Sequence, residues 1–321
     1  MEAPARKTSR KARIVFAIAV FGTFAILYLL VAKLATLGDF WGALSSASPL
    51  LVALAIALVL VNIGLAAVRL SLTFGVLGAH VPFGRSVETV LATFPLAVIT
   101  PSRAGDAARA VALRDLLPIP EGVSAVLAEK LVDVHSLLVL ALVGSATVGL
   151  WSMFAVALAG LLGQYLATFL LLRHAPRLEN IGWLQRFGDK PRRLVSGLEH
   201  LVARPRSLLL LAGVSVMAFA NAVGLAYALT EAVGADLPLT VVMALWPLSL
   251  FAGLLPITIG GIGTRDGAFV GLLTFAGIAF HSGAVLAATV LYAVVATALP
   301  AVLGLWPMLR HARALAAPSS T

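Results

Sequence analysis

One short segment combines charged residues with a helix-breaking proline in a way that suits anion binding. It contains Thr100, Pro101, Arg103, Asp106 and Arg109. The proline disfavours a continuous helix, and the threonine, or the serine after the proline, can cap the helix that follows. On that helix the two arginines and the aspartate fall within an arc of about 120°, at about 100° per residue. A helix N-terminus with two guanidinium groups predicts a phosphate site. The alternative is an Arg–Asp pair that only fixes membrane topology.

A second segment repeats features of the first. Aligned without gaps, it shares the Ile-Thr start, which ends at Thr258, a central glycine and a later alanine. Its helix-breaking residues are Gly260, Gly261 and Gly263. Successive glycines let the backbone approach a ligand closely, and Arg265 and Asp266 follow them. We expect the isolated cation Arg265 to bind an anionic partner, either a phosphate or only Asp266. The alternative is a tight turn between two half-helices.

Three charged residues lie within one predicted span. Glu129 and Asp133 are four positions apart and share a helix face, with Lys130 on its flank. Charges inside a span are costly and normally face the protein interior or water. Lys130 can neutralise one carboxylate. The other is expected to bind a proton or a cation, or to pair with Arg103 or Arg109, unless the cluster only stabilises the bundle.

Two polar residues lie seven positions apart on one face of an earlier predicted span. They are Asn62 and Arg69. The arginine either lines a cavity, pairs with another helix or extends to the cytoplasmic surface, as long basic side chains near helix ends do. The last two interpretations are slightly favoured. Both residues are secondary candidates for the site, together with Thr100 and Thr258.

The composition places this chemistry in a membrane. The 321 residues are 60% hydrophobic and 12% charged, and the mean hydropathy is +1.02. Soluble domains carry about 25% charged residues, so we expect an all-α polytopic membrane protein. The chain has no cysteine, which excludes disulfides and thiol chemistry. No metal-ligand spacing and no nucleotide fingerprint occurs, so no metal, cofactor or catalytic residue is predicted.

Hydrophobic runs divide the chain into six full spans and two interrupted segments. The full spans are predicted at about 14–37, 50–78, 120–147, 149–172, 207–233 and 283–308. The interrupted segments, at about 86–116 and 238–280, are typical of broken or re-entrant helices. The whole chain is interpreted as one membrane domain. It comprises a first repeat at about 50–147, a basic cytoplasmic loop at about 173–206 and a second repeat at about 207–308.

The distribution of basic residues sets the orientation. The formal net charge is +9, but the lysines and arginines cluster beside spans, which indicates topology and anionic-lipid contact rather than a nucleic-acid partner. Both termini are then cytoplasmic. Three crossings separate the interrupted segments, so we expect them to insert from opposite faces as inverted repeats. The run Ala-Val-Leu-Ala at 125–128 recurs at 284–287 and weakly supports a duplication.

Three ordered motifs resemble the lysylphosphatidylglycerol synthase transmembrane family. Residues 101–109 match its pattern P-x-R-x-G-D-x-x-R, and residues 129–133 match its Glu-Lys-x-x-Asp element. Residues 256–267 resemble its later motif, which commonly reads P-G-G-I-G-x-R-E. Here Ile259 replaces the proline and Asp266 replaces the glutamate.

The resemblance implies a flippase-like domain. In multidomain members this domain moves an aminoacylated phospholipid to the outer leaflet after a soluble domain has made it. We expect no lysyl transfer here, because the chain ends soon after the last span. Stand-alone members are linked to translocating, or assisting the metabolism of, polyprenyl-phosphate-linked sugars, glycolipids or hopanoid lipids, and the resemblance does not choose among them.

Together these features predict translocation of an anionic or polyprenyl-phosphate lipid across a bacterial cytoplasmic membrane. Arg103 and Arg109 would hold the phosphate from the cytoplasmic side, and Arg265 would be a second station. One alternative is a membrane enzyme that uses the acidic pair or His135 as acid or base. The other is a non-catalytic partner of a lipid-modifying enzyme. Membrane lipids are the predicted partners, and a lipid-modifying enzyme or a second copy of the chain is left open.

Overall fold

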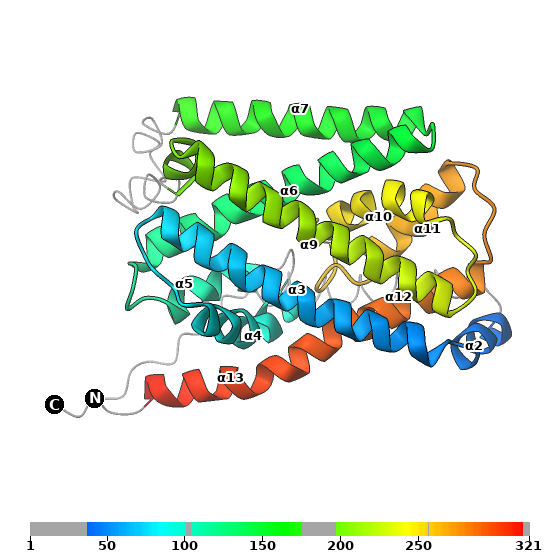
Figure 1. Cartoon of the computed structure of the whole chain (residues 1–321), viewed down its shortest axis with the longest axis horizontal. Helices are drawn as coiled ribbons and strands as arrows, with labels where there is room; N and C mark the ends of the chain where they lie inside the picture. Colours follow the sequence, from blue (N-terminus) through cyan, green and yellow to red (C-terminus); the bar gives the residue numbers. More distant parts are fainter. Residues whose placement is uncertain (1–36, 101–103, 175–196, 256, 317–321) are drawn as a thin grey trace.

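The computed structural model describes residues 37–100, 104–174, 197–255 and 257–316, and every regular element among them is helical. Figure 1 shows the arrangement. The first half comprises α2 (Leu37–Ser45), α3 (Pro49–Val76), α4 (Phe83–Ile99), η1 (Ala104–Ala107), α5 (Ala108–Ala112) and α6 (Ile119–Thr147). The predicted all-α fold is confirmed.

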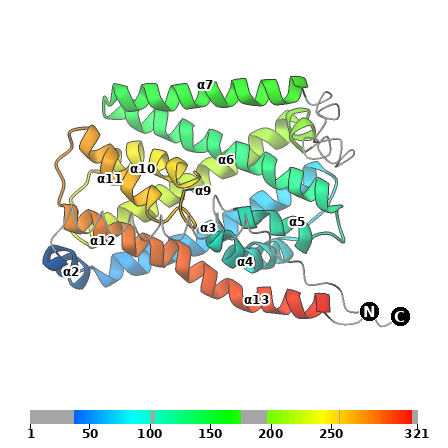
Figure 2. The same ribbon diagram turned by 180° about the vertical axis from the view of Figure 1, so that it is seen from behind.

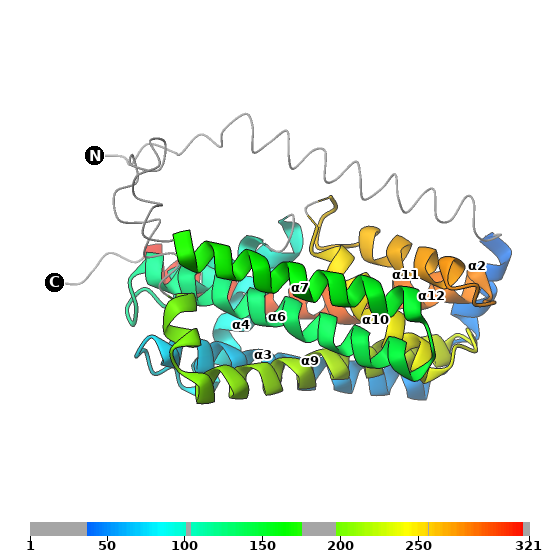
Figure 3. The ribbon, with the colours of Figure 1, turned by 90° about the horizontal axis from the view of Figure 1, so that it is seen from above.

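The second half follows α7 (Trp151–His174), which lies along the outside of α6 in all three ribbon views (Figure 3). It begins with a short helix at residues 197–202. Its other elements are α9 (Pro205–Ala232), α10 (Leu239–Gly253), α11 (Thr264–Phe275), α12 (Ser282–Ala293), the π-helical turn η4 (Val294–Ala298) and α13 (Leu299–Ala316). The last three form one continuous band (Figure 2).

Four of the described helices are long and apolar enough to cross a bilayer. They are α3, α7, α9 and the composite helix Ser282–Arg310. The 29-residue α6 is equally long and carries the predicted charged cluster. The count of six spans stays a prediction, because residues 14–36 lie outside the described residues. The same holds for most of the basic loop, at 175–196.

Both predicted interruptions are present as breaks between helices. In the first half α4 ends at Ile99, and helical structure resumes at Ala104. In the second half α10 ends at Gly253 and α11 begins at Thr264. Each broken pair begins after a proline and carries another inside its first helix, which limits regular backbone hydrogen bonding there.

The two halves meet through an antiparallel pair of 28-residue helices, α3 and α9. The Ser48 N–H donates to the Ala232 carbonyl at 2.8 Å, joining the start of α3 to the end of α9. At the other end Arg204 Nη1 donates to the Val76 carbonyl at 2.6 Å. Residue 204 lies 156 positions after 48, and residue 232 lies 156 positions after 76. Each contact therefore joins the start of the long helix in one half to the end of the long helix in the other half.

A second pair of contacts has the same reciprocal form. The Gly197 N–H donates to Ser124 Oγ at 2.5 Å, where the helix preceding α9 meets the start of α6. Gly283, at the start of α12, lies against Asp39 of α2, the helix preceding α3. Each half thus places its short leading helix on the last long helix of the other half.

Small residues allow the halves to approach closely. Gly144 of α6 lies against the backbone of α10 at Met243, and Gly304 of α13 lies against the backbone of α4 at Leu91. Backbone approach at glycine is the common way for membrane helices to gain packing contacts, because apolar burial gives little driving force within lipid. These two approaches bring each broken pair against the opposite half.

Replacing Gly144 by valine is expected to push α6 away from α10. A Cβ atom at this position would lie 2.5 Å from the Met243 carbonyl oxygen. Overpacking typically costs about 1–3 kcal/mol, so the midpoint of thermal unfolding in detergent should fall. Gly163→Val on the exposed α7 is the control, because nothing lies within 4 Å of its Cβ position. Equal falls in both variants would contradict this explanation.

Candidate functional site

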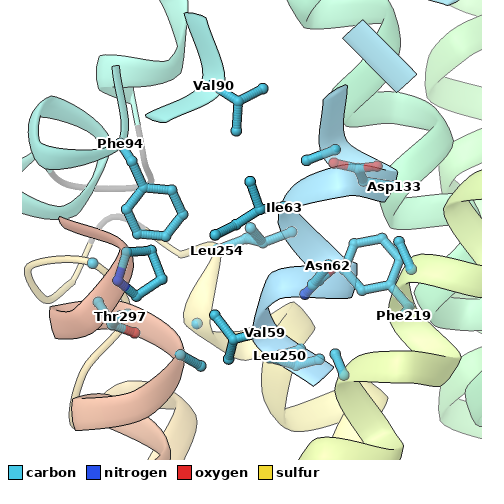
Figure 4. Close-up of a pocket in the computed structure, with 18 of the residues that line it drawn as sticks. Val59, Asn62, Ile63, Val90, Phe94, Asp133, Phe219, Leu250, Leu254 and Thr297 are labelled. Atoms are coloured by element: carbon cyan, nitrogen blue, oxygen red, sulfur yellow. The ribbon is translucent and has the colours of Figure 1, made fainter. Parts of the chain in front are cut away.

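A cavity of about 180 Å³ lies between the two halves. Its charged lining residues are Arg69, Arg109, Glu129, Lys130, Asp133 and Arg265. Its apolar wall includes Phe94 of α4 and Phe219 of α9, which lie on opposite sides of α3 (Figure 4). Ligand pockets for drug-sized molecules measure about 300–1,000 Å³, so this cavity is sized for a small group such as a phosphate.

Glu129 lies at the centre of the charges on the first-half side. Its Oε1 atom accepts hydrogen bonds from Arg69 Nη2 at 2.9 Å and from Arg109 Nη1 at 3.0 Å. One carboxylate oxygen therefore bridges two guanidinium groups, one from α3 and one from α5. Arg69 also donates to Asp133, one helical turn further along α6. The predicted pairing of an α6 carboxylate with Arg109 is present.

Two further residues close these contacts into a ring. Arg109 Nη2 donates to Asp106 Oδ1 at 3.2 Å. Lys130 Nζ lies 2.6 Å from Asp106 Oδ2 and 3.7 Å from Asp133 Oδ2. We name this set the six-charge ring: Arg69, Glu129, Arg109, Asp106, Lys130 and Asp133, in which cations and carboxylates alternate. Its formal charge is zero, which is what allows it to be buried.

The local backbone explains how these side chains meet. Asp106 and Arg109 are three positions apart across η1 and α5 and form an i,i+3 pair. Gly105 lies directly against the carbonyl end of α4 at Leu96, and Gly122 lies against Ala110. These contacts fold the short helix back onto α4 and hold it beside α6. Thr100 Oγ1 accepts the Gly105 N–H of η1 at 2.7 Å, whereas the N-cap position of α5 is Ala107.

A surface ion pair fixes the other end of this segment. Arg85, near the start of α4, donates to both carboxylate oxygens of Asp115 at 2.6 and 2.7 Å. These hydrogen bonds lower the pKa of the Asp115 carboxyl. Because Asp115 is mostly exposed, the pair positions the connection before α6 rather than stabilising the fold strongly.

Of the two favoured interpretations of Arg69, pairing with another helix is confirmed and extension to the cytoplasmic surface is wrong. Its side chain does not extend to the surface, since it is 8% exposed, bonded to two carboxylates and stacked on Phe219. The physical reason is charge balance. Without Arg69, the Glu129 and Asp133 carboxylates would be left with fewer counter-charges in an apolar interior, which is more costly than the conformational entropy of fixing one arginine.

In the second half the cation is held differently. Arg265 donates through Nε and Nη2 to Asp266 Oδ1 at 2.8 and 2.6 Å. Its guanidinium also lies 4.5 Å from the centre of the Tyr292 ring and 5.6 Å from that of Trp246. Asp266 Oδ2 accepts the Gly263 N–H at 2.9 Å and so caps α11. The interpretation that Arg265 pairs with Asp266 therefore holds in this structure.

The two breaks come into contact beside the cavity. Gly260 has a φ of +59°, and a Cβ there would lie 3.0 Å from the Val98 carbonyl oxygen at the end of α4. Thr258 Oγ1 lies 2.9 Å from Thr264 Oγ1 and links the two sides of the second break. Gly260 and Gly261 line the cavity with the ring. The predicted glycine-rich turn thus lets one interrupted helix reach the other.

The site contains most of the predicted residues and several unpredicted ones. Asn62 lines the cavity, whereas Asp106 and Asp266 lie behind its charged wall. Arg103, with its neighbours at 101 and 102, lies outside the described residues. The sequence interpretation missed further lining residues, among them Phe94, Phe219, Leu250, Leu254, Tyr292 and Thr297. The sequence carries no local signal that would have indicated Thr297, which lies in the π-helical turn η4.

A comparison with protein families matches the sequence of the chain to one of them. The family model described as the lysylphosphatidylglycerol synthase TM region matches residues 14–304. The chain belongs to this family. The resemblance of its three motifs is therefore confirmed, and with it a membrane lipid-related function. A search of curated proteins finds no match to the chain.

Arg69→Met is expected to destabilise the protein strongly, because it leaves the buried ring with an excess carboxylate. Removing one partner of a buried ion pair costs about 3–5 kcal/mol. The double variant Arg69→Met/Asp133→Asn restores neutrality and should recover part of this loss. A double-mutant cycle of unfolding free energies in detergent measures the coupling. Simple additivity of the two single losses would contradict a charge-balanced ring.

Proposed function

We propose that this protein moves an anionic phospholipid or a polyprenyl-phosphate lipid between the leaflets of a bacterial cytoplasmic membrane. One observation carries the proposal. Four cations line the cavity directly, namely Arg69, Arg109, Lys130 and Arg265, against two carboxylates. The two balancing aspartates lie behind this wall. A small buried space with excess guanidinium and ammonium groups suits a phosphate, whose oxygens accept bidentate hydrogen bonds.

The arrangement of the halves supports inverted repeats. The α3–α9 pair is antiparallel, and its two end contacts are related by one offset of 156 residues. Two halves in opposite orientation around one site can open it alternately to either face. In this proposal both broken pairs are re-entrant, one from each face, and both termini are cytoplasmic.

The size of the cavity limits what part of the lipid it takes. About 180 Å³ holds the phosphate and the atoms next to it, so the acyl or prenyl chains stay in the bilayer. Lys130 is the most accessible member of the ring, with 29% of its side chain exposed, whereas the other five are at most 8% exposed. A headgroup therefore meets Lys130 first and the two bridged arginines later.

Arg265→Met is expected to slow lipid movement about tenfold or more. Hydrogen bonds to charged groups contribute about 1.5–3 kcal/mol. Arg265 donates to Asp266 through Nε and Nη2, so its Nη1 group is the one that would donate to a phosphate in the second half. The measurement is the leaflet exchange of fluorescent phosphatidylglycerol and of a fluorescent polyprenyl phosphate in proteoliposomes. Arg114→Met is the matched control, because that arginine is exposed outside the cavity.

Two outcomes would count against translocation. Correctly folded wild-type protein that moves none of the tracers would exclude it for these lipid classes. Conversion of a tracer into a new product without added partners would indicate a membrane enzyme instead. Gel filtration of Arg265→Met and Arg114→Met before reconstitution separates loss of binding from loss of folding.

A further inference from the structure

We infer that Glu129 takes up one proton when an anionic headgroup enters the cavity, so that lipid and proton cross together without net charge movement. This rests on the proposed translocation and adds its energy coupling. The starting observation, counted over the residues that the structure describes, is the formal neutrality of the six-charge ring and of the Arg265–Asp266 pair. A phosphodiester added to a neutral buried cluster would leave one uncompensated negative charge, which is costly in a low-dielectric interior.

The geometry identifies Glu129 as the group that gives way. Its Oε1 occupies the position between Arg69 and Arg109 that a phosphate oxygen would take. Its side chain is 2% exposed, and its Oε2 has no hydrogen-bond partner among the described residues. The Nε atoms of Arg69 and Arg109 likewise have no partner there. Glu129, Arg69 and Arg109 therefore form the position that an anion would occupy. They also carry the polar atoms that could make further hydrogen bonds.

The other charged groups around Glu129 determine the net charge of the site. Arg69 faces it from α3 and Arg109 from α5, while Lys130 and Asp133 flank it on α6. Asp106 on η1 pairs with Arg109 on the side away from the cavity, and Arg265 on α11 lies across the cavity. Phe219, on α9, adds no charge, and α10 contains no ionisable residue. Within the described ranges, Glu129 is the acid that accepts hydrogen bonds from both arginines.

The exchange then balances without a further ion. A phosphate oxygen replaces Glu129 Oε1 between the two guanidinium groups, and a proton from the water on the side of arrival binds Glu129 Oε2. The headgroup brings one negative charge and the proton one positive charge. When the lipid leaves on the other face, the proton returns to water there and Glu129 Oε1 accepts again from Arg69 and Arg109.

The steady-state distribution of a tracer between leaflets tests this coupling. Proteoliposomes of phosphatidylcholine would contain a trace of fluorescent phosphatidylglycerol, with either a pH difference or a potassium-diffusion potential imposed. Coupled movement predicts a shift of about tenfold for one pH unit and none with potential. Uncoupled movement of one charge predicts a shift of up to about 50-fold at 100 mV and none with pH.

Glu129→Gln should convert coupled movement of lipid and proton into uncoupled movement of a charged lipid. Its distribution should lose the response to pH and gain the response to potential. Glu231→Gln, an exposed glutamate at the end of α9, should behave like the wild type. A pH response of wild-type size that persists in Glu129→Gln would overturn the assignment to Glu129.

A wild-type distribution that follows potential and ignores pH would overturn the inference and leave translocation intact. Absence of any tracer movement would reject both. If Glu129→Gln fails to fold, proton uptake by wild-type protein decides the matter. Addition of short-chain phosphatidylglycerol in weakly buffered detergent should consume about one proton per lipid bound. Binding without proton uptake would overturn the inference.

Discussion

The bridging of Arg69 and Arg109 by a single carboxylate oxygen of Glu129 is the interaction on which the first half depends. Each of these charges would be prohibitively costly alone in the interior of a membrane domain. Because the acid comes from α6 and the cations from α3 and α5, satisfying them fixes the relative positions of three elements. The break after α4 allows the short helix α5 to fold back, so that Arg109 reaches Glu129.

Close packing at glycines brings the six-charge ring against the second half. Gly144 and Gly304 bring α6 onto α10 and α13 onto α4, and Gly260 brings the second break onto the end of α4. Without these close approaches the six-charge ring and Arg265 would line separate spaces. A shared cavity is thus a consequence of packing between halves, while its charge pattern is a consequence of pairing within each half.

Sequence reasoning reached the acidic pair, Lys130, Arg109 and both breaks because each leaves a local signal. Charges four apart share a helix face, and glycine or proline inside an apolar run interrupts a helix. For Arg69 the sequence left pairing, cavity lining and surface extension open, because its partners lie 60 and 64 residues away. The apolar wall was missed for another reason. In a membrane chain Phe94 or Phe219 has the same sequence signal whether it faces lipid or a cavity.

The halves differ in the acid that an arriving anion would displace. With the Ala-Val-Leu-Ala runs aligned, Glu129 corresponds to Ala288 and Asp133 to Tyr292, so the second half has no carboxylate at either position. Arg265 is then held by ring faces that no anion needs to displace, and by Asp266, which is also fixed as the cap of α11. Glu129 caps no helix and has an unpartnered oxygen within the described part of the chain. Under the proposed mechanism exchange is therefore concentrated at Glu129, and Arg265 keeps its partner throughout.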